Sequence, residues 1–412
     1  MKKFRIPIFT LLAISLIAVC CEGCKFIRVY RDMTAGDVTA ISVRDTIPFE
    51  YRNNKLIIKA KVNGREYDFV LDTGAPTVIW EEVALDLQLP KTKASFVSKD
   101  ANGTEQKLEF YHTEAVTVGN LKIENMNMAS TNTLAGEVRC YANGGIIGGN
   151  FLMHYNWQID YDNKRLIASS DISKLKIPKD ATKVDVVVTR PQGQIIIGKV
   201  RILGEEEDFV LDTGNGGSIN LAMEKLNIKE AGDHVVYVET YGYSSGSTGG
   251  RKLITSHVLQ TDVALPMDTI HNAIIHVNTK SSLLGNEYLA QFGTITLENT
   301  SKQQAVYFNK KKAKAAAAIT YGFDPIFHKE SNSFIIGKVY KDSEAERLGL
   351  QVNDKILAIN GTDLSTIDYA TYCSNKYLGS SLYTMEGETV GLKILRDGKK
   401  MDIKIRRSPL FH

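Results

Sequence analysis

The sequence predicts a mainly β protein built from two similar halves and a smaller C-terminal domain. The phrase Asp-Phe-Val-Leu-Asp-Thr-Gly occurs at residues 68–74 and again at 208–214, an offset of 140 residues. Around both copies, strand-forming residues are separated by turn signals such as Asn63-Gly64, as is typical of β-hairpins. From Thr320 the pattern changes, and a short helical segment precedes new strand-forming residues. These three observations indicate two repeated β units followed by a separate domain.

Composition and charge narrow the class of protein. The chain has 412 residues, of which 43% are hydrophobic and 24% charged, so it has the balance of a globular protein with several domains. The formal net charge is +3, and no basic stripe is interleaved with aromatic residues. We therefore expect no nucleic-acid partner.

Residues 1–24 have the features of an export signal. Lys2, Lys3 and Arg5 form a positive amino-terminal region, and an apolar segment follows from residue 6 to residue 20. That segment is shorter than the roughly 17–25 residues of a membrane-spanning helix. Three interpretations stay open: lipid attachment at Cys20 or Cys21, simple cleavage, and an uncleaved anchor. In each case the protein is expected to be exported, to a periplasmic or cell-envelope location.

The remaining chain divides at changes of pattern. We expect an irregular, polar tether first and a Lys/Ala-rich linker before the last domain, as a helical spacer or as a flexible one. The expected segments are a tether at 25–48, a first lobe (lobe 1) at 49–172, a second lobe (lobe 2) at 183–310, a linker at 311–319 and the C-terminal domain at 320–408.

The cysteines beyond the amino-terminal region are few. Cys140 and Cys373 are isolated from each other in the sequence, so they predict no disulfide framework. No spacing of His, Cys or acidic residues suggests a metal site. The sequence therefore predicts neither a metal nor another cofactor.

Two acids stand out because each follows an uninterrupted apolar strand. Asp72 and Asp212 both come directly after Phe-Val-Leu, where an unpaired carboxylate is costly to bury. Two carboxyl groups held close together share one proton, since both cannot ionise cheaply. Such a pair supplies a general acid and a general base from identical side chains, which is the requirement for hydrolysing an amide with water.

The doubled phrase resembles the active-site signature of aspartic proteases of the retropepsin and pepsin kind. In that family two apolar residues and a glycine close beneath each catalytic loop, and this chain has them at residues 146–148 and 283–285. The resemblance implies two retropepsin-like β-barrel lobes in a pseudo-two-fold acid-protease fold, with Asp72 and Asp212 as catalytic residues. It also implies support of the active-site loops by Thr73, Gly74, Ala75, Gly148, Thr213, Gly214, Asn215 and Gly285.

Each lobe also has a candidate flap, the hairpin that covers bound peptide in this family. In lobe 1 the turn Asn102-Gly103 lies about 30 residues after the catalytic acid. In lobe 2 the corresponding segment contains Tyr241, Gly242 and Tyr243. For these tyrosines two interpretations stay open, as flap residues or as turn aromatics.

The chain departs from the family pattern after the second Asp-Thr-Gly. Asn215 stands where serine or alanine is usual. Its amide could donate a hydrogen bond to Asp212 and lower the pKa of that acid, or it could crowd the site. Ala75, at the matching position, has no hydroxyl to offer Asp72. We therefore expect Asp212 to be the more readily ionised acid and Asp72 to hold the shared proton.

The C-terminal domain resembles a PDZ domain, a small α+β fold. The resemblance is carried by residues 343–350, a short helix ending in Gly-Leu, and by residues 353–362, in which Asn-Asp leads through a strand to Asn-Gly. Tyr321, Gly322 and Phe323 then occupy the place of the loop that binds a C-terminal carboxylate, beside a strand that pairs with the peptide.

Together these observations predict an exported aspartic endopeptidase whose PDZ domain captures a peptide or protein substrate. The PDZ resemblance implies that the captured segment is a C-terminal peptide. Because both halves lie in one chain, a monomer is expected. Two alternatives remain. One is a catalytically inactive peptide-binding protein, and the other is a cell-envelope scaffold whose lobes pair with other subunits.

Overall fold

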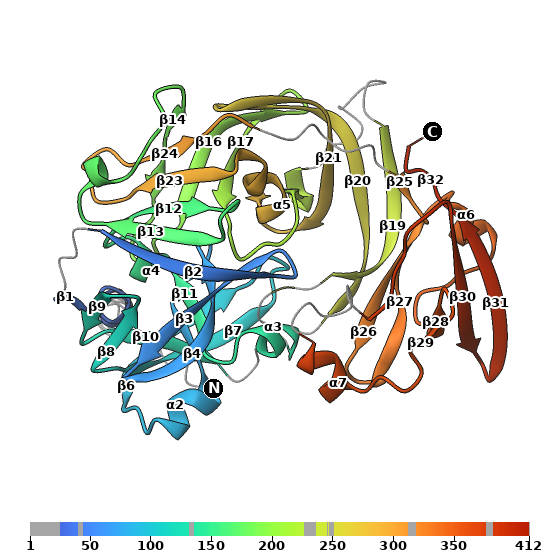
Figure 1. The fold of residues 1–412 in the computed structure, drawn as a ribbon, viewed down its shortest axis with the longest axis horizontal. Coiled ribbons are helices and arrows are strands. Elements are labelled where there is room, and N and C mark those ends of the chain that lie inside the picture. Colours follow the sequence, from blue (N-terminus) through green and yellow to red (C-terminus); the bar gives the residue numbers. More distant parts are fainter. Residues whose placement is uncertain are drawn as a thin grey trace, which may run out of the picture.

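A computed structural model describes residues 25–39, 44–131, 136–225, 236–244, 246, 251–311, 319–375 and 382–411 (Figure 1). The predicted export signal, with Cys20 and Cys21, lies outside these residues, as does most of the Lys/Ala-rich linker. Within the described part of the chain, none of the helices has the length and apolar character needed to cross a membrane.

Lobe 1 is built from hairpins whose turns match the sequence signals. Asn63 and Gly64 have φ values of 48° and 84°, as a tight two-residue hairpin turn requires. They join β3 (Lys55–Val62) to β4 (Arg65–Asp72). The other elements are β2 (Asp45–Arg52), β5 (Val78–Trp80), α2 (Glu81–Asp86), β6 (Lys91–Lys99), β7 (Glu105–His112), β8 (Ala115–Val118), β9 (Leu121–Glu124), β10 (Asn127–Thr131), α3 (Gly136–Tyr141), β11 (Gly145–Gly148), α4 (Gly149–Leu152), β12 (Asn156–Asp160) and β13 (Arg165–Ser169).

Lobe 2 repeats this plan with longer strands. Its core hairpin joins β16 (Ile195–Ile202) to β17 (Glu205–Leu211), with a bulge between Ile197 and Val200. The other elements are η1 (Ile172–Lys174), which precedes the lobe, β14 (Thr182–Asp185), β15 (Val187–Val188), β18 (Ile219–Ala222), η2 (Met223–Lys225), β19 (Val236–Ser244), β20 (Lys252–Leu265), β21 (Asp268–Thr279), β22 (Leu283–Leu284), α5 (Asn286–Leu289), η3 (Ala290–Phe292), β23 (Thr294–Glu298) and β24 (Ala305–Phe308).

The two lobes are joined by a shared sheet. Its strand order is β14-β24-β23-β12-β13-β2, with β12 of lobe 1 paired antiparallel to β23 of lobe 2. The side chains of β12 are all buried, so this junction is part of the hydrophobic core. The prediction of a mainly β fold with two related lobes is confirmed.

The C-terminal domain has a mixed α+β composition, as predicted. Its helix α6 (Glu344–Arg347) begins at Ser343, whose side chain accepts a hydrogen bond from the Glu346 amide. The other elements are β25 (Ile319–Thr320), β26 (Phe323–His328), β27 (Ser333–Tyr340), β28 (Lys355–Ile359), β29 (Thr362–Asp363), α7 (Tyr369–Ser374), β30 (Thr389–Arg396), β31 (Lys399–Arg406) and β32 (Ser408–Pro409).

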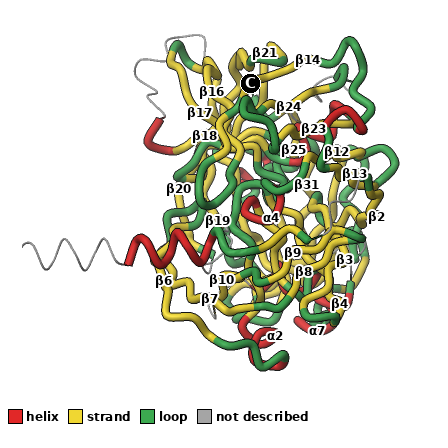
Figure 2. The backbone as a smooth tube through the Cα atoms, turned by 90° about the vertical axis from the view of Figure 1, so that its left-hand side faces the viewer, coloured by secondary structure: helices red, strands yellow, loops and turns green. Residues whose placement is uncertain are grey.

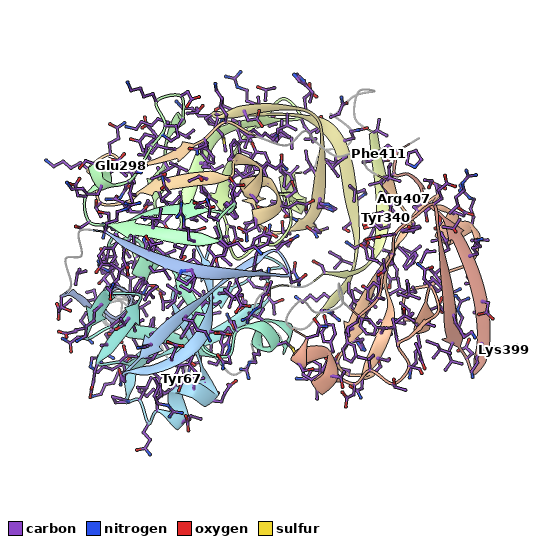
Figure 3. The ribbon with its side chains drawn as sticks, viewed as in Figure 1. Tyr67, Glu298, Tyr340, Lys399, Arg407 and Phe411 are labelled. Carbon is purple, nitrogen blue, oxygen red and sulfur yellow. A yellow bond between two sulfur atoms is a disulfide. The ribbon has the colours of Figure 1, made fainter. Side chains whose placement is uncertain are left out.

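This domain continues the sheet of lobe 2. Strand β27 pairs antiparallel with β19, with Thr240 opposite Tyr340 and Gly242 opposite Lys338. Figure 3 shows Tyr340 at this junction, between the long strands of lobe 2 and the rest of the C-terminal domain. The domain is therefore hydrogen-bonded to the lobe rather than attached by the linker alone.

The expectation of an irregular tether at residues 25–48 is wrong. Residues 25–33 form a helix that runs beside β6 (Figure 2), β1 (Asp37–Val38) pairs with β9, and β2 begins at Asp45. Met33 is buried in the core, and the buried Asp32 accepts a 2.5 Å hydrogen bond from Thr92. These contacts give the segment a folded position that its polar composition does not reveal.

Candidate active site

The two acids are brought together by matching strand ends. Asp72 is the last residue of β4, and Asp212 directly follows β17. In each lobe the apolar-apolar-glycine segment runs parallel to that strand, and Gly148 lies opposite Asp72 in β11. Asp72 is buried and Asp212 half-buried, and their carboxyl groups lie within hydrogen-bonding reach of each other.

The threonines after the two acids lock the lobes together. The Thr73 hydroxyl donates to the Leu211 carbonyl at 2.5 Å and accepts from the Thr213 amide at 3.1 Å. The Thr213 hydroxyl donates to the Leu71 carbonyl at 2.9 Å and accepts from the Thr73 amide at 3.1 Å. Both threonines are buried, so these four bonds hold the two loops in one relative position.

The glycines are required because each lies against the opposite acid. The amides of Gly74 and Gly214 donate to their own lobe's Asp Oδ1, at 2.8 and 2.9 Å. A Cβ atom on Gly214 would collide with the Asp72 carboxylate, and one on Gly74 would lie 2.8 Å from Asp212 Cγ. Any side chain at these positions would therefore separate the two carboxyl groups.

The side chain of Asn215 does not reach Asp212, although its backbone does. The Asn215 amide nitrogen of the main chain donates to Asp212 Oδ1 at 3.1 Å. The side-chain Nδ2 donates instead to Asn220 Oδ1 at 2.8 Å, and Oδ1 accepts from the Gly217 amide. The expectation that this side chain supports or crowds Asp212 is therefore wrong, because the side chain stabilises its own loop.

Burial acts on the ionisation of both acids. It raises the pKa of both above the usual range. The Gly74 amide, the Asp212 carboxyl and the Lys55 charge offset part of this effect on the pKa of Asp72. Burial and then the negative charge of Asp72 hold the pKa of Asp212 well above its ordinary value. The surroundings of the pair therefore favour one shared proton over two ionised carboxyl groups.

Two polar side chains at the site were not singled out from the sequence. Lys55 Nζ donates to the Gly214 carbonyl at 2.6 Å, and Gln194 Nε2 donates to the Gly74 carbonyl at 2.6 Å. The two bonds are related by the pseudo-two-fold symmetry, but only one of them brings a positive charge. Comparing the repeats at a strict offset of 140 misses this pair, because the bulge in β16 adds one residue to lobe 2.

The lobe 1 flap lies where it was predicted. The turn between β6 and β7 is closed by Asp100, whose Oδ1 accepts from the amides of Asn102 and Thr104. Across the cleft, the Ala101 carbonyl accepts from the Lys280 amide at 2.5 Å, and Ser244 Oγ donates to Asn102 Oδ1 at 3.0 Å. This flap therefore contacts lobe 2 over the two acids. Gly103, with φ of 70°, lies against the Lys280 side chain.

The lobe 2 flap candidates separate into two groups. Tyr243 lines the cleft, whereas Tyr241 and Gly242 pair with Val339 and Lys338 of β27, and Tyr241 is half exposed. For these two residues a role as cover for the acids is wrong, because they form the junction with the C-terminal domain.

The expected carboxylate-binding loop of the C-terminal domain is closely packed. Tyr321 and Phe323 are buried, and the Tyr321 hydroxyl donates to the Gly387 carbonyl at 2.8 Å. Gly322 has φ of 83°, and its amide donates to Thr320 Oγ1 at 3.0 Å. The amide expected to bind a carboxylate therefore already has an intramolecular acceptor.

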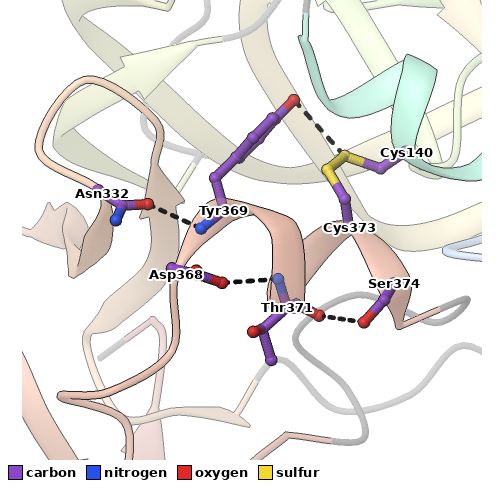
Figure 4. Close-up of a disulfide and its surroundings, with 7 residues drawn as sticks. All are labelled: Cys140, Asn332, Asp368, Tyr369, Thr371, Cys373 and Ser374. Carbon is purple, nitrogen blue, oxygen red and sulfur yellow. Dashed lines mark hydrogen bonds between the residues drawn. A yellow bond between two sulfur atoms is a disulfide. The ribbon is translucent and has the colours of Figure 1, made fainter.

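The structure pairs the two isolated cysteines, for which the sequence predicted no disulfide framework. Cys140 on α3 of lobe 1 and Cys373 on α7 of the C-terminal domain form a disulfide, although 233 residues separate them in the chain (Figure 4). Sequence spacing carries no signal for such a pair, because only the tertiary fold brings α3 and α7 together.

A cavity of about 870 Å³ opens above the two acids. It is lined by residues of both lobes and of the C-terminal domain. Among the described residues, no cluster of three or more His, Cys, Asp or Glu side chains has the geometry of a metal site. This volume lies within the range of ligand-binding clefts.

Comparison with known proteins agrees with this geometry. Residues 58–151 match the family model for aspartyl proteases, and residues 335–373 match that for PDZ domains. The chain thus contains a retropepsin-like aspartyl protease domain and a PDZ domain. No curated protein matches the chain.

The solved structures with partial similarity include two aspartic proteases and an HtrA-type protease. An aspartic proteinase from Irpex lacteus is 12% identical, with 66% of this chain and 99% of that chain covered and a TM-score of 0.38. A retropepsin-like aspartic protease from Rickettsia conorii is 22% identical, with 30% of this chain and 89% of that chain covered and a TM-score of 0.23. The HtrA-type protease AlgW, solved with a decapeptide, is 13% identical, with 57% of this chain and 81% of that chain covered and a TM-score of 0.19.

Proposed function

We propose that this protein is an aspartic endopeptidase that hydrolyses peptide bonds with water activated by Asp72 and Asp212. The observation that carries the proposal is the interlocked pair itself. Two acids from different lobes lie side by side, and four buried hydrogen bonds between Thr73, Thr213 and the opposite strands fix their separation. A structural role alone does not explain why two like-charged groups are held together under burial.

In this proposal Asp72 is the ionised member of the pair and Asp212 holds the shared proton, the reverse of the order expected from Ala75 and Asn215. The Asp72 carboxylate takes a proton from a water molecule while the oxygen of that water attacks the peptide carbonyl carbon. At the same time Asp212 gives its proton to the carbonyl oxygen. The tetrahedral diol then collapses. Asp72 returns its proton to the leaving nitrogen, Asp212 regains one from a hydroxyl, and the C–N bond breaks to give an acid and an amine.

The surroundings of the pair fit this reaction. The amides of Gly74 and Gly214 stabilise the carboxyl groups in place, and the lobe 1 flap limits access of water from above. Because both acids come from one chain, we infer a catalytic unit that is complete as a monomer. The PDZ domain binds peptide or protein segments in this proposal, and its junction with β19 places it beside the cleft.

We also infer that the protein is exported. The apolar segment within residues 1–24 supports secretion, with Cys20 or Cys21 as candidate lipid attachment sites. The disulfide between Cys140 and Cys373 supports an oxidising compartment, since such bonds are rare in reducing ones.

The test is incubation of the purified protein with a mixed peptide library, with and without a statine-type transition-state inhibitor, followed by mass spectrometry. We expect internal cleavage that the inhibitor blocks. The alternative, a catalytically inactive peptide-binding protein, predicts bound inhibitor and intact peptides. Absence of both cleavage and inhibitor binding would contradict the proposed function.

A further inference from the structure

The C-terminal domain contributes residues to the cavity that holds the two catalytic acids. Phe327 and His328 at the end of β26, Lys329 and Glu330 in the following turn, and Tyr369 at the start of α7 all line it. Sequence reasoning placed peptide binding by this domain at its loop around Gly322, at the other end of β26. The cavity instead reaches the end of the domain that faces the acids.

The domain is fixed in this position on the side of lobe 2. Beyond the pairing of β27 with β19, the Lys341 amide donates to the Glu239 carbonyl at 2.9 Å. Tyr243 bridges the parts directly, because its hydroxyl donates to Asn353 Oδ1 at 2.8 Å and its ring lies 5.6 Å from that of His328. The same tyrosine lines the cavity, so the cleft wall is continuous from lobe 2 into the C-terminal domain.

The domain is also fixed on the side of lobe 1. The disulfide joins α7 to α3, and the Tyr369 hydroxyl lies 3.6 Å from Cys140 Sγ (Figure 4). Val138, on the same helix as Cys140, lines the cavity as well. Tyr369 is therefore held where the third part of the wall meets lobe 1.

The C-terminal domain adds polar and charged groups to the cleft wall. It presents the Tyr369 ring with the Lys329 ammonium 4.8 Å from its centroid. Beside them the His328 imidazole Nε2 lies 3.3 Å from the Glu330 carboxylate. Lobe 1 presents a mixed wall, in which the apolar Phe96, Val97 and Leu108 lie among polar residues that include Lys99 and Gln106. The part of the cleft formed by the C-terminal domain thus suits polar or charged side chains.

We propose that the PDZ domain forms part of the catalytic cleft itself, and that Tyr369, His328 and Glu330 contact side chains of the peptide bound across Asp72 and Asp212. The substrate is then an extended peptide with a polar or charged side chain toward the C-terminal domain. This inference rests on the proposed function and adds to it the origin of substrate selection.

The test is calorimetric binding of statine peptides of two lengths, since binding needs no turnover. A four-residue inhibitor spans only the two acids. Two eight-residue inhibitors contain the same four residues, and one is extended at its N-terminal end while the other is extended at its C-terminal end. We expect one extended inhibitor to bind the wild type at least about tenfold more tightly than the short one. Tyr369→Ala and His328→Ala should remove most of that gain and leave binding of the short inhibitor unchanged.

Charge reversal gives a second measurement that does not disturb packing, because the Glu330 side chain is 75% exposed. An extended inhibitor with lysine at the position facing the wall should bind Glu330→Lys about fivefold more weakly than the wild type, and one with glutamate more tightly. The matched control is Lys399→Ala, because Lys399 is exposed at the outer end of the domain (Figure 3). This substitution should leave the affinity for both extended inhibitors unchanged.

The outcomes separate the two proposals. If the short inhibitor binds and the extended inhibitors are indifferent to all three cleft substitutions, the PDZ domain does not contact the peptide and the inference is wrong. If no statine peptide of either length binds, the proposed function fails, and the inference fails with it.

Discussion

The two lobes carry the same seven-residue phrase, but their surroundings give them different tasks. In lobe 1 the outermost strand of the sheet is β6, and Lys55 brings a positive charge to the acids. In lobe 2 the corresponding outer strand, β19, is paired with the C-terminal domain, and neutral Gln194 takes the place of the lysine. The two lobes therefore have the same backbone structure around the acids, but they differ in the charge of a neighbouring side chain and in whether their outer strand is paired with the C-terminal domain.

This difference shows how a symmetric framework produces an asymmetric site. The two acids have the same chemistry and nearly the same backbone donors, and burial raises the pKa of both, yet the positive charge of Lys55 comes from one lobe only. An acid and a base arise from identical residues only when such an inequality exists. The following experiments test it, beginning with the largest expected effect.

The strongest test is removal of either acid. Asp72→Asn and Asp212→Asn should each lower kcat by at least about a thousandfold, because acid and base act as a unit. Peptide cleavage should be followed by mass spectrometry, with circular dichroism to verify the fold. Asp185→Asn, at an exposed acid of lobe 2, is the control and should keep full activity. Substantial activity in either catalytic variant would exclude the shared-proton mechanism.

The next test concerns the attachment of the C-terminal domain to lobe 1. The double substitution Cys140→Ser with Cys373→Ser should lower the free energy of unfolding by about 2–5 kcal/mol, since the bond closes a very long loop. It should also weaken binding of the extended statine peptide. Denaturant unfolding with and without reductant is the measurement, and the reduced wild type should behave like the double variant. A stability that is indifferent to reductant would contradict the disulfide.

Exchange of the two polar side chains tests the charge difference between the lobes. Lys55 lowers the pKa of both acids, although burial is the larger influence and raises them. Lys55→Gln should therefore raise the pKa of Asp72, so the acid limb of the rate profile moves to higher pH. Gln194→Lys should move it to lower pH.

The control for this exchange is Lys59→Gln, which removes a lysine of the same strand that pairs with Asp68 at 2.6 Å instead. Its pH profile should match the wild type, whose activity is expected to extend to mildly acidic pH because burial raises the pKa of the acids and so keeps the shared proton in place there. Equal profiles for Lys55→Gln and Lys59→Gln would show that Lys55 does not act on the acids.

The smallest expected effect is on stability. Burial and then the charge of Asp72 raise the pKa of Asp212 above its unfolded value, so the folded protein binds more protons between the two pKa values. Stability must then fall as the pH rises through that window. The Asp212→Asn variant has no carboxyl group at position 212 to titrate in that window. Its free energy of unfolding should therefore fall less than that of the wild type from about pH 4 to about pH 8. Parallel curves of unfolding free energy against pH would contradict the raised pKa.

The sequence by itself determined the two-lobed β fold, the identity of the two acids and the C-terminal domain, because these depend on local pattern. Strand alternation, Asn-Gly turns and the repeated Asp-Thr-Gly are readable over a few residues. Support of the active-site loops by Thr73 and Thr213 also followed from the resemblance. The helix at residues 25–33 did not, since its position depends on burial of Met33 and on the hydrogen bond of Asp32 with Thr92, which lies far along the chain.

The tertiary structure alone decided which charges surround the two acids and what encloses the cleft. Each of these depends on groups far apart in the chain, such as Lys55 beside Gly214 and Cys140 beside Cys373. Local periodicity carries no information about such pairs, because it reports only which face of a strand or helix is apolar. Electrostatic effects on a buried acid depend on distance in space, so they become predictable only once the two lobes and the PDZ domain are assembled.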